Sequence, residues 1–230
     1  MSAQDFFRNM MLLAYWGINM YLSQVEIDTR NRKKIRDLTH LGAYHNWVEK
    51  SFPDEISAET HTRKLWRTDQ LRGKQYLLVT SKNKPDLKKL ELYGVKGSAR
   101  TKKYTPFLNH LKKGMRTQFK VTLNPVISLY EGPNKRGRVV PCVSEKDQMN
   151  YLLERSVKNG FILDEESFFI SDRGFEVLKK SKQKSIRLSK ATYEGILTID
   201  DVEIFKKTLV NGFGKKKAYG FGLMTVIPEV

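Results

Sequence analysis

The chain has 230 residues, 40% of them hydrophobic, which is enough to form a core in one domain of ordinary size or in two small ones. Its 42 lysines and arginines outnumber its 25 aspartates and glutamates. The net charge of +17 at pH 7 favours a polyanionic partner, nucleic acid before any other; a highly charged protein without such a partner is the alternative. The single cysteine, Cys142, excludes an intramolecular disulfide and a cysteine-based zinc site, and it fits a reducing cytoplasm.

Residues 1–19 are expected to form an extension ahead of the fold, which begins with a strand at 20–28. The apolar run of residues 10–22 is too short to span a bilayer. Because the acidic Asp5 precedes the first basic residue and no small-residue cleavage site follows, this run does not resemble a secretory signal. A short amphipathic segment that touches a membrane is the alternative for this run; otherwise we expect no membrane partner.

The first half of the chain carries the order β-α-β-β-β, with an irregular segment before its last strand, which is most of a ferredoxin-like unit. Apolar residues close to helical spacing predict a helix that extends to about residue 51. They are Leu38, Leu41, Val48 and Phe52. The other expected elements are a hairpin of strands 64–70 and 75–81 with its turn at 71–74, an irregular basic stretch over 82–113, and a strand at 116–123. We assign residues 20–124 to this N-terminal domain.

Asn124-Pro125 breaks the pattern, and the second half carries the order α-β-β-α-β. The elements expected there are a basic turn at 133–138, a helix at 144–158 capped by Ser144, strands at 161–178 and 185–198 with the first interrupted at 171–174, a helix at 201–211 capped by Asp200, and a strand at 221–228. Residues 125–230 are therefore assigned to a C-terminal domain. The predicted fold is α+β, with two tandem ferredoxin-like (RRM-like) domains.

Residues 211–222, which we call the glycine–lysine loop, combine the features of a phosphate-binding segment. Glycines let a backbone approach a phosphate and present its N–H groups, lysines add charge, and an aromatic ring can stack on a base. The residues concerned are Gly212, Gly214, Gly220 and Gly222, with Lys215, Lys216 and Lys217, and the aromatics Tyr219 and Phe221. Since the loop follows a helix and leads into a strand, it does not match a dinucleotide-binding fingerprint.

The sequence lacks the motifs of several common catalytic and nucleotide-binding sites. It contains no Walker loop, no H-E-x-x-H, no carboxylate cluster suited to two metals and no nucleophile elbow, so we expect neither a metal nor a cofactor. RNA cleavage remains open to a basic protein, because RNA carries its own nucleophile in the 2′-OH. A histidine can move the protons, while lysines and backbone N–H groups stabilise the developing charge.

Four histidines could do this proton chemistry. His45 falls within the apolar stripe of the first predicted helix, so it should face inward, either as a catalytic group or as a histidine satisfied in the core or at the domain seam. His40 lies off that stripe and should be exposed. His61 and His110 lie in polar, irregular stretches and are expected to be surface residues.

Five stretches of the chain, in the same order, resemble the CRISPR RNA-processing endoribonucleases of the CasE family, from type I-E systems. The resemblance spans about residues 20–228. The stretches are Met20-Tyr21-Leu22-Ser23, Ala43-Tyr44-His45-Asn46-Trp47-Val48 with Ser51-Phe52-Pro53, Leu123-Asn124-Pro125, Tyr193-Glu194-Gly195-Ile196-Leu197-Thr198-Ile199, and Gly212 to Leu223.

This resemblance implies a catalytic role for His45 in metal-independent transesterification, with a 2′,3′-cyclic phosphate and a 5′-OH as products. Some members have a tyrosine one helical turn earlier, where this chain has Gly42. Tyr44 is retained as a catalytic candidate, although on a helix it would point about 100° away from His45.

The resemblance also implies two RNA-binding segments, the glycine–lysine loop and a basic hairpin that grips a stem-loop. The hairpin residues are Lys179, Lys180, Lys182, Lys184 and Arg187, for which an ordinary exposed charge run is the alternative. The partners implied are a CRISPR precursor RNA hairpin, the mature guide RNA that stays bound, and the other subunits of a surveillance complex. A non-catalytic RNA-binding subunit, in which His45 is structural, is the competing hypothesis.

Overall fold

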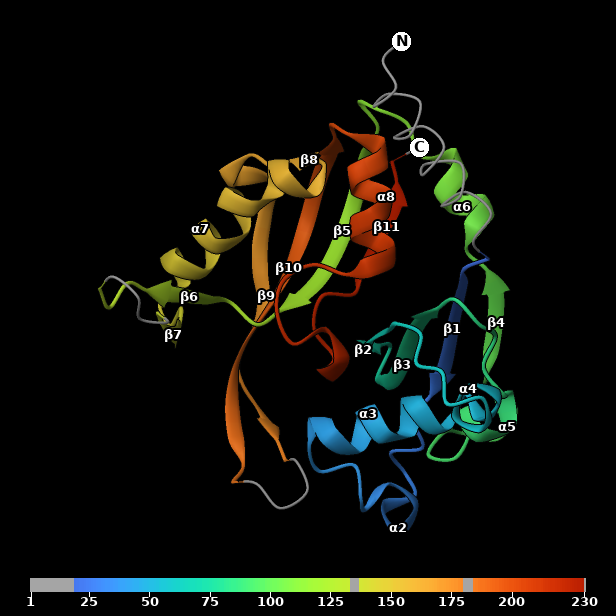
Figure 1. The fold of residues 1–230 in the computed structure, drawn as a ribbon. Helices are drawn as coiled ribbons and strands as arrows, with labels where there is room; N and C mark the ends of the chain where they lie inside the picture. Colours follow the sequence, from blue (N-terminus) through green and yellow to red (C-terminus); the bar gives the residue numbers. More distant parts are fainter. Residues whose placement is uncertain (1–18, 133–136, 180–183, 230) are drawn as a thin grey trace.

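The computed structural model describes residues 19–132, 137–179 and 184–229, and these form two large sheets with their helices and one small two-stranded sheet (Figure 1). Apart from Asn19, the extension expected over 1–19 lies outside the described residues. Within the described ranges no helix has the length and hydrophobicity needed to cross a membrane.

The first sheet has four antiparallel strands in the order β2-β3-β1-β4. They are β1 (Tyr21–Glu26), β2 (Lys64–Leu71), β3 (Lys74–Ser81) and β4 (Arg100–Lys103). The helices of this half are α2 (Arg32–Ile35), α3 (Leu41–Lys50), α4 (Pro53–Ser57), α5 (Leu87–Leu90) and α6 (Thr105–His110). Trp47 and Val48 of α3 share a buried cluster with Val25, Leu77 and Val79, so α3 covers one face of this sheet.

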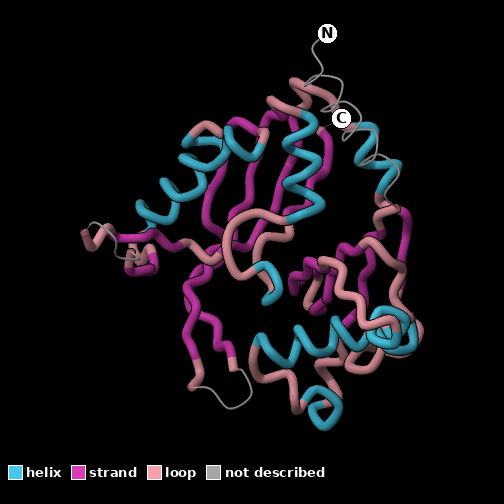
Figure 2. Tube along the Cα trace, in the orientation of Figure 1, coloured by secondary structure: helices cyan, strands magenta, loops and turns pink. Residues whose placement is uncertain are grey.

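The second sheet repeats this strand order, β11-β5-β10-β8, and β9 also pairs with β10. Its strands are β5 (Arg116–Leu123), β8 (Phe161–Ile162), β9 (Phe168–Leu178), β10 (Ile186–Ile199) and β11 (Met224–Pro228). Figure 2 shows its long helices on one face, and a small hairpin extends beside it. These elements are α7 (Glu145–Ser156), α8 (Val202–Asn211), β6 (Val126–Leu129) and β7 (Arg138–Pro141), with the short 3-10 turns η1 (Val157–Asn159), η2 (Glu165–Ser167) and η3 (Lys217–Tyr219). The predicted pair of tandem ferredoxin-like units is confirmed.

The strand predicted at 116–123 exists, but its assignment to the first unit is wrong. As β5 it pairs with β10, from Ala191↔Leu123 to Thr198↔Arg116, and with β11 on its other side. The fourth strand of the first sheet is instead β4, in the stretch expected to be irregular. Its sequence, Arg-Thr-Lys-Lys, lacks an apolar alternation because it forms a mostly exposed edge. We propose that the two domains divide within residues 104–115, ahead of the predicted boundary at 124.

Turn and cap residues located most of the other elements correctly. The hairpin turn consists of Arg72 and Gly73, both with positive φ as a two-residue hairpin loop requires. Ser144 caps α7 by accepting a hydrogen bond from the Asp147 N–H. The cap of α8 is Asp201 and not Asp200, while the helix expected up to residue 51 begins only at Leu41.

Strand β9 continues through residues 171–174, so the interruption predicted there is reduced to a β-bulge. Thr192 of β10 pairs with Asp172 and Tyr193 pairs with Ile170, so the extra residue of this bulge is Ser171 on β9. Four residues of the basic turn expected at 133–138 lie outside the described part of the chain.

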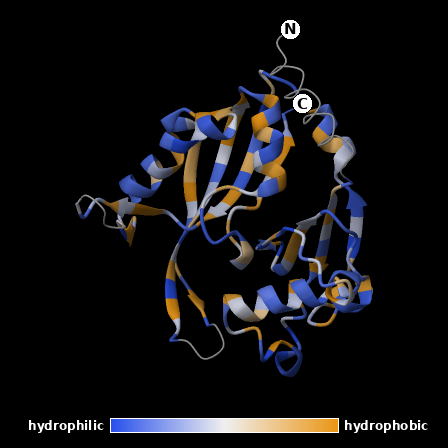
Figure 3. Cartoon of the chain, in the orientation of Figure 1, coloured by the Kyte–Doolittle hydropathy of each residue, from blue (hydrophilic) through white to orange (hydrophobic). Residues whose placement is uncertain are grey.

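Each unit has its own core, but the second unit contributes to the core of the first. Helix α8 is amphipathic, as its alternating hydropathy shows (Figure 3), and it buries Phe205 and Leu209 in the second core. Leu178 and Leu188 from the β9–β10 hairpin are buried with α3 in the first core, and so is Phe221 of the glycine–lysine loop. The two units are therefore packed together through these segments.

A buried arginine joins the two sheets. Arg67 of β2 is 2% exposed, and its guanidinium donates to the carbonyls of Lys120 on β5 (2.7 Å) and of Leu223 (2.8 Å), and to Thr225 Oγ1 (2.9 Å). Asp69 accepts two further bonds of 2.8 Å and balances the charge. Because Leu223 follows the glycine–lysine loop directly, Arg67 also fixes the end of that loop against the first sheet.

Candidate functional site

His45 lies on α3 at the seam with the second unit. Its side chain is 33% exposed, so it is half-buried at the border of the buried face formed by Leu41, Trp47 and Val48. Its ring and that of Tyr219 on η3 meet in an edge-on arrangement, with 5.2 Å between the centroids. His45 therefore points towards the second unit, as an inward-facing residue should, but its ring is partly exposed to solvent and is not buried in the core.

Backbone and charge around His45 set its protonation. Burial lowers the pKa of His45 below its usual value, and the positive charge of Lys64 lowers it further. The carboxylate of Glu49 and the Ala218 carbonyl, which accepts a hydrogen bond from the ring, raise this pKa and offset part of the shift. The same carbonyl accepts a 2.9 Å bond from Trp66 Nε1, which fixes its position. With its pKa lowered, the imidazole is mostly neutral at pH 7 and able to accept a proton.

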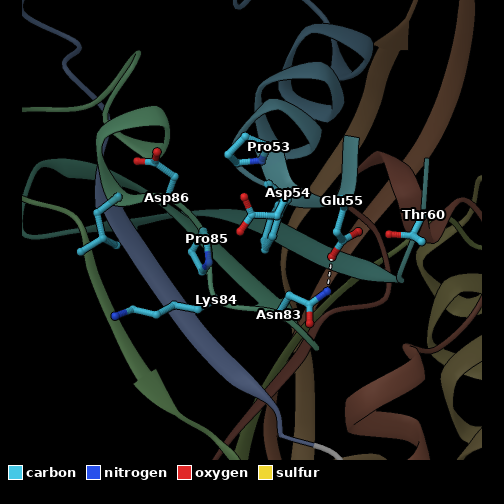
Figure 4. A pocket seen from close by; sticks show the side chains of 10 residues that line it. Pro53, Asp54, Glu55, Thr60, Asn83, Lys84, Pro85 and Asp86 are labelled. Atoms are coloured by element: carbon cyan, nitrogen blue, oxygen red, sulfur yellow. Dashed lines mark hydrogen bonds between the residues drawn. The ribbon is translucent and has the colours of Figure 1, made fainter. Parts of the chain in front are cut away.

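Behind His45 lies a network of ion pairs that leads to the buried Lys64 and Glu55. His45 Nδ1 is 3.9 Å from Glu49 Oε1, and Glu49 Oε2 is 2.9 Å from Lys64 Nζ. Lys64 is also paired at 2.8 Å with Glu55 Oε2. Glu55 Oε1 in turn accepts from Asn83 Nδ2 at 2.8 Å, as Figure 4 shows in the 730 Å³ hollow that these two residues help to line. Sequence reasoning missed this network, since residues on α3, α4 and β2 form it.

Three of the four loop glycines are required by packing within the protein. All four have φ between 75° and 84°. A Cβ on Gly212 would lie 2.7 Å from Leu65 Cδ2, one on Gly220 would lie 2.7 Å from Trp66 Cζ3, and one on Gly222 would overlap the Phe213 carbonyl. Only Gly214 has room for a methyl group, with 3.4 Å to Tyr151 Oη. An RNA-binding role for these glycines stays a prediction, and the structure gives three of them a different reason to be glycine.

The three lysines of the loop differ in their surroundings. Lys215 and Lys216 are exposed. The ammonium of Lys217 is turned back into the loop and donates to the carbonyls of Asn211 (3.1 Å) and Gly212 (2.6 Å). Burial, helped by Arg63, lowers the pKa of Lys217. Lys217 therefore holds the loop, whereas Lys215 and Lys216 face solvent, where an RNA backbone could bind.

Tyr44 packs in an aromatic cluster beside the site. Its ring stacks on Trp66 with centroids 5.6 Å apart and lies 6.2 Å from Trp47. Burial, with a smaller effect of Glu176, raises the pKa of its hydroxyl, so it is a poor proton acceptor at neutral pH. The tyrosine in ring contact with His45 is Tyr219, whose pairing with a residue so distant in the chain only the folded structure reveals.

The basic hairpin predicted to grip RNA is the end of β9 and β10, which extends past the second sheet to α3 (Figure 1). Lys179, Lys184 and Arg187 are exposed there, and the Arg187 guanidinium lies 4.8 Å above the Phe175 ring. Lys180 and Lys182 lie outside the described residues. The Lys179 carbonyl oxygen packs against Gly42, and a Cβ at this position would collide with that oxygen. This contact explains why the chain has glycine at the position of the upstream tyrosine.

The other histidines lie away from this seam. His40 is half-buried, not exposed as predicted, because its Nδ1 caps α3 by accepting from the Ala43 N–H at 3.2 Å. His61 and His110 are exposed, as expected. Of the four, His45 alone is in ring contact with the glycine–lysine loop among the described residues.

A second hollow, of 510 Å³, lies between the two sheets and is lined by ion pairs. Lys120 is 3.0 Å from Glu194, and Lys190 is 2.9 Å from Asp172 and 2.8 Å from Glu176. Each of these cations is thus matched by carboxylates. The hollow offers no cationic surplus to a phosphate backbone, so the basic surface beside His45 remains the candidate RNA site.

Comparison with known proteins agrees with this arrangement. A family model described as "CRISPR associated protein" matches residues 20–228. The CRISPR-associated endoribonuclease Cse3 of Thermus thermophilus is 28% identical over 220 residues, which cover 91% of this chain and 100% of that protein. The structure of Thermus thermophilus Cse3 bound to an RNA representing a pre-cleavage complex has a TM-score of 0.74 at 27% identity, covering 91% of this chain and 100% of that one.

Cas6e from Escherichia coli shares the fold, with a TM-score of 0.55 at 22% identity and coverage of 91% of this chain and 100% of that one. The matches extend across both ferredoxin-like units and the loop that joins them at His45. The chain therefore belongs to the CRISPR associated protein family, and its resemblance to the CasE (Cse3) members of that family is confirmed.

Proposed function

We propose that this protein is a metal-independent endoribonuclease that cleaves CRISPR repeat precursor RNA at a hairpin and retains the mature guide RNA. The observation that carries the proposal is His45: a half-exposed imidazole with a lowered pKa, set at the seam between a lysine-bearing loop and a basic hairpin. The similar Cse3, named an endoribonuclease and seen with RNA in a pre-cleavage complex, supports it.

In this reaction His45 takes the proton of the 2′-OH as that oxygen attacks the adjacent phosphate. The phosphate–O5′ bond breaks, the departing O5′ takes a proton from water, and His45 returns its own proton to solvent, so the products are a 2′,3′-cyclic phosphate and a 5′-OH. Lys215 and Lys216 stand beside the site to stabilise the charge that builds on the phosphate oxygens. The family resemblance makes Tyr44 a catalytic candidate too, but its packing and raised pKa favour a supporting role for its ring.

The stem of the RNA would be held by the hairpin lysines and Arg187, which read it by shape and phosphate position. Support for this comes from the exposure of Lys179, Lys184 and Arg187 on a hairpin that ends beside α3. A similar fold occurs in a CRISPR RNA-guided surveillance complex, and we propose that this chain acts with such subunits. We place it in the cytoplasm, in keeping with its one buried, unpaired cysteine.

The competing proposal is a non-catalytic RNA-binding subunit. The contacts of His45 with the Ala218 carbonyl and the Tyr219 ring favour it, since they would give the ring a structural role in joining the units.

The two proposals can be separated by a cleavage assay in excess chelator. The substrate is the hairpin repeat RNA from the CRISPR locus that belongs with this protein. The unmodified protein should cut. His45→Ala should lose about 10²–10⁴ in rate, the usual contribution of a positioned acid–base group, and keep its RNA affinity. His61→Ala, which removes an exposed histidine, is the matched control and should cut normally.

A 2′-deoxy nucleotide before the cut should block cleavage and leave binding intact, because the nucleophile is then missing. Binding without any cleavage by the unmodified protein would establish the non-catalytic subunit. Cleavage that the chelator abolishes would refute the metal-independent mechanism.

A further inference from the structure

The ion pairs behind His45 form a chain with one fixed end. Lys64 is the fixed end, because its side chain is 1% exposed and its ammonium contacts Glu49, Glu55 and the Thr62 carbonyl. Such a buried, triply bonded ammonium cannot change position without leaving charges unpaired. Glu49 is the next member, with one carboxylate oxygen 2.9 Å from Lys64 Nζ and the other 3.9 Å from His45 Nδ1.

From this geometry we propose that Glu49, clamped by Lys64, is the positioning residue for His45 in the cleavage reaction. The inference rests on the proposed function and deepens it. Glu49 itself touches no RNA atom in this scheme; it acts only through the imidazole.

The distance between Glu49 and the ring determines how the carboxylate can act on His45. Glu49 Oε1 lies 3.9 Å from His45 Nδ1, which is beyond hydrogen-bond distance, so the carboxylate acts on the ring through its charge, while the Ala218 carbonyl accepts the hydrogen bond from the ring. The same carboxylate stabilises the imidazolium once the ring has accepted the 2′-OH proton, as an acidic partner does for a histidine in other acid–base sites.

The charges of the cluster agree with this role. Lys64, Glu49 and Glu55 together carry a charge of −1, which a protonated His45 neutralises. The groups that face His45 are Glu49 on α3, Lys64 on β2, and the Ala218 carbonyl and Tyr219 ring on η3. Among them Glu49 is the charged group that favours the imidazolium.

Glu49→Gln tests the proposal, because the amide keeps the shape and loses the charge while Lys64 keeps Glu55 as a partner. We expect the pKa of His45, measured by NMR titration of its ring protons, to fall. The acid limb of the single-turnover rate against pH should move to lower pH with it. The maximal rate should fall by about 10- to 100-fold, part of the 10²–10⁴ that a positioned acid–base group contributes.

Two further variants guard against a merely structural effect. Asp54→Asn removes an exposed carboxylate from the neighbouring α4 and should leave both the titration and the rate profile unchanged. Glu49→Asp keeps the charge but withdraws it from Nδ1, so the rate should fall with only a small movement of the His45 pKa. RNA affinity and thermal unfolding are measured for each variant.

The two proposals fail in different ways. If the unmodified protein does not cut, the proposed function fails, and the positioning role fails with it. If the unmodified protein cuts, His45→Ala does not, and Glu49→Gln cuts at the normal rate with an unshifted acid limb, only the positioning role is refuted. A shifted His45 pKa with an unchanged maximal rate would also overturn it, because Glu49 would then tune the ring without positioning it.

Discussion

The packing of Gly220 on Trp66 gives the sharpest test of what the glycine–lysine loop does. Gly220→Ala places a Cβ 2.7–2.8 Å from two atoms of an indole that is 2% exposed. The left-handed φ of +81° costs a non-glycine residue about 1–2 kcal/mol, and overpacking a buried site adds about 1–3 kcal/mol. The free energy of unfolding should therefore fall by about 2–5 kcal/mol.

Gly214→Ala is the matched control, because it has a similar φ of +78° and its Cβ meets nothing closer than 3.4 Å. It should lose only the conformational part, about 1–2 kcal/mol. In a Trp66→Phe background, where the clashing indole atoms are gone, Gly220→Ala should lose no more than Gly214→Ala. Urea unfolding of the four proteins in this cycle measures the coupling, expected at about 1–3 kcal/mol.

The functional readout follows from the position of η3, whose Ala218 and Tyr219 contact His45. Gly220→Ala should slow RNA cleavage more than Gly214→Ala does, with similar RNA affinity in both. Equal losses of stability and no coupling to Trp66 would refute the packing argument. A loss of RNA affinity confined to Gly214→Ala would show instead that the loop backbone cradles a phosphate.

Three other outcomes can be measured. Arg67→Met should lower the free energy of unfolding by about 3–5 kcal/mol in urea, because a buried charge and two sheet-joining carbonyls lose their partner; a loss below about 1 kcal/mol would contradict this. Burial alone would raise the pKa of Glu55, but hydrogen bonds from its neighbours lower this pKa from 4.5 to about 2. The ionised Glu55 therefore contributes about 3 kcal/mol to the free energy of unfolding above pH 4.5, and this contribution should disappear as the pH falls towards 2. Glu55→Gln should lack this acid dependence in unfolding experiments. Lys215→Ala and Lys216→Ala should each reduce the salt dependence of RNA binding, whereas Lys217→Ala should destabilise the loop and leave that dependence unchanged.

Local chemistry was readable from the chain. Turn and cap residues such as Gly73 and Ser144 act through their own neighbours, so the hairpin and α7 could be located without a structure. The net charge of +17 and the resemblance around His45 likewise identified the class of partner and the candidate acid–base group.

Pairing between distant segments was decided only by the tertiary structure. Strand β5 looks like the end of the first unit, yet its backbone hydrogen bonds go to β10 and β11, and nothing in its own residues specifies that choice. The role of the loop glycines was likewise decided by the tertiary structure. The composition of the loop predicted phosphate binding, whereas the positive φ of these glycines and their contacts with Leu65, Trp66 and Phe213 show that they pack closely at the seam between the units. The sequence by itself determined which residues can do chemistry on RNA. The fold decided that Tyr219, Ala218 and Lys64 surround His45, because these contacts depend on tertiary packing, whereas Glu49 is its i,i+4 neighbour on the same helix.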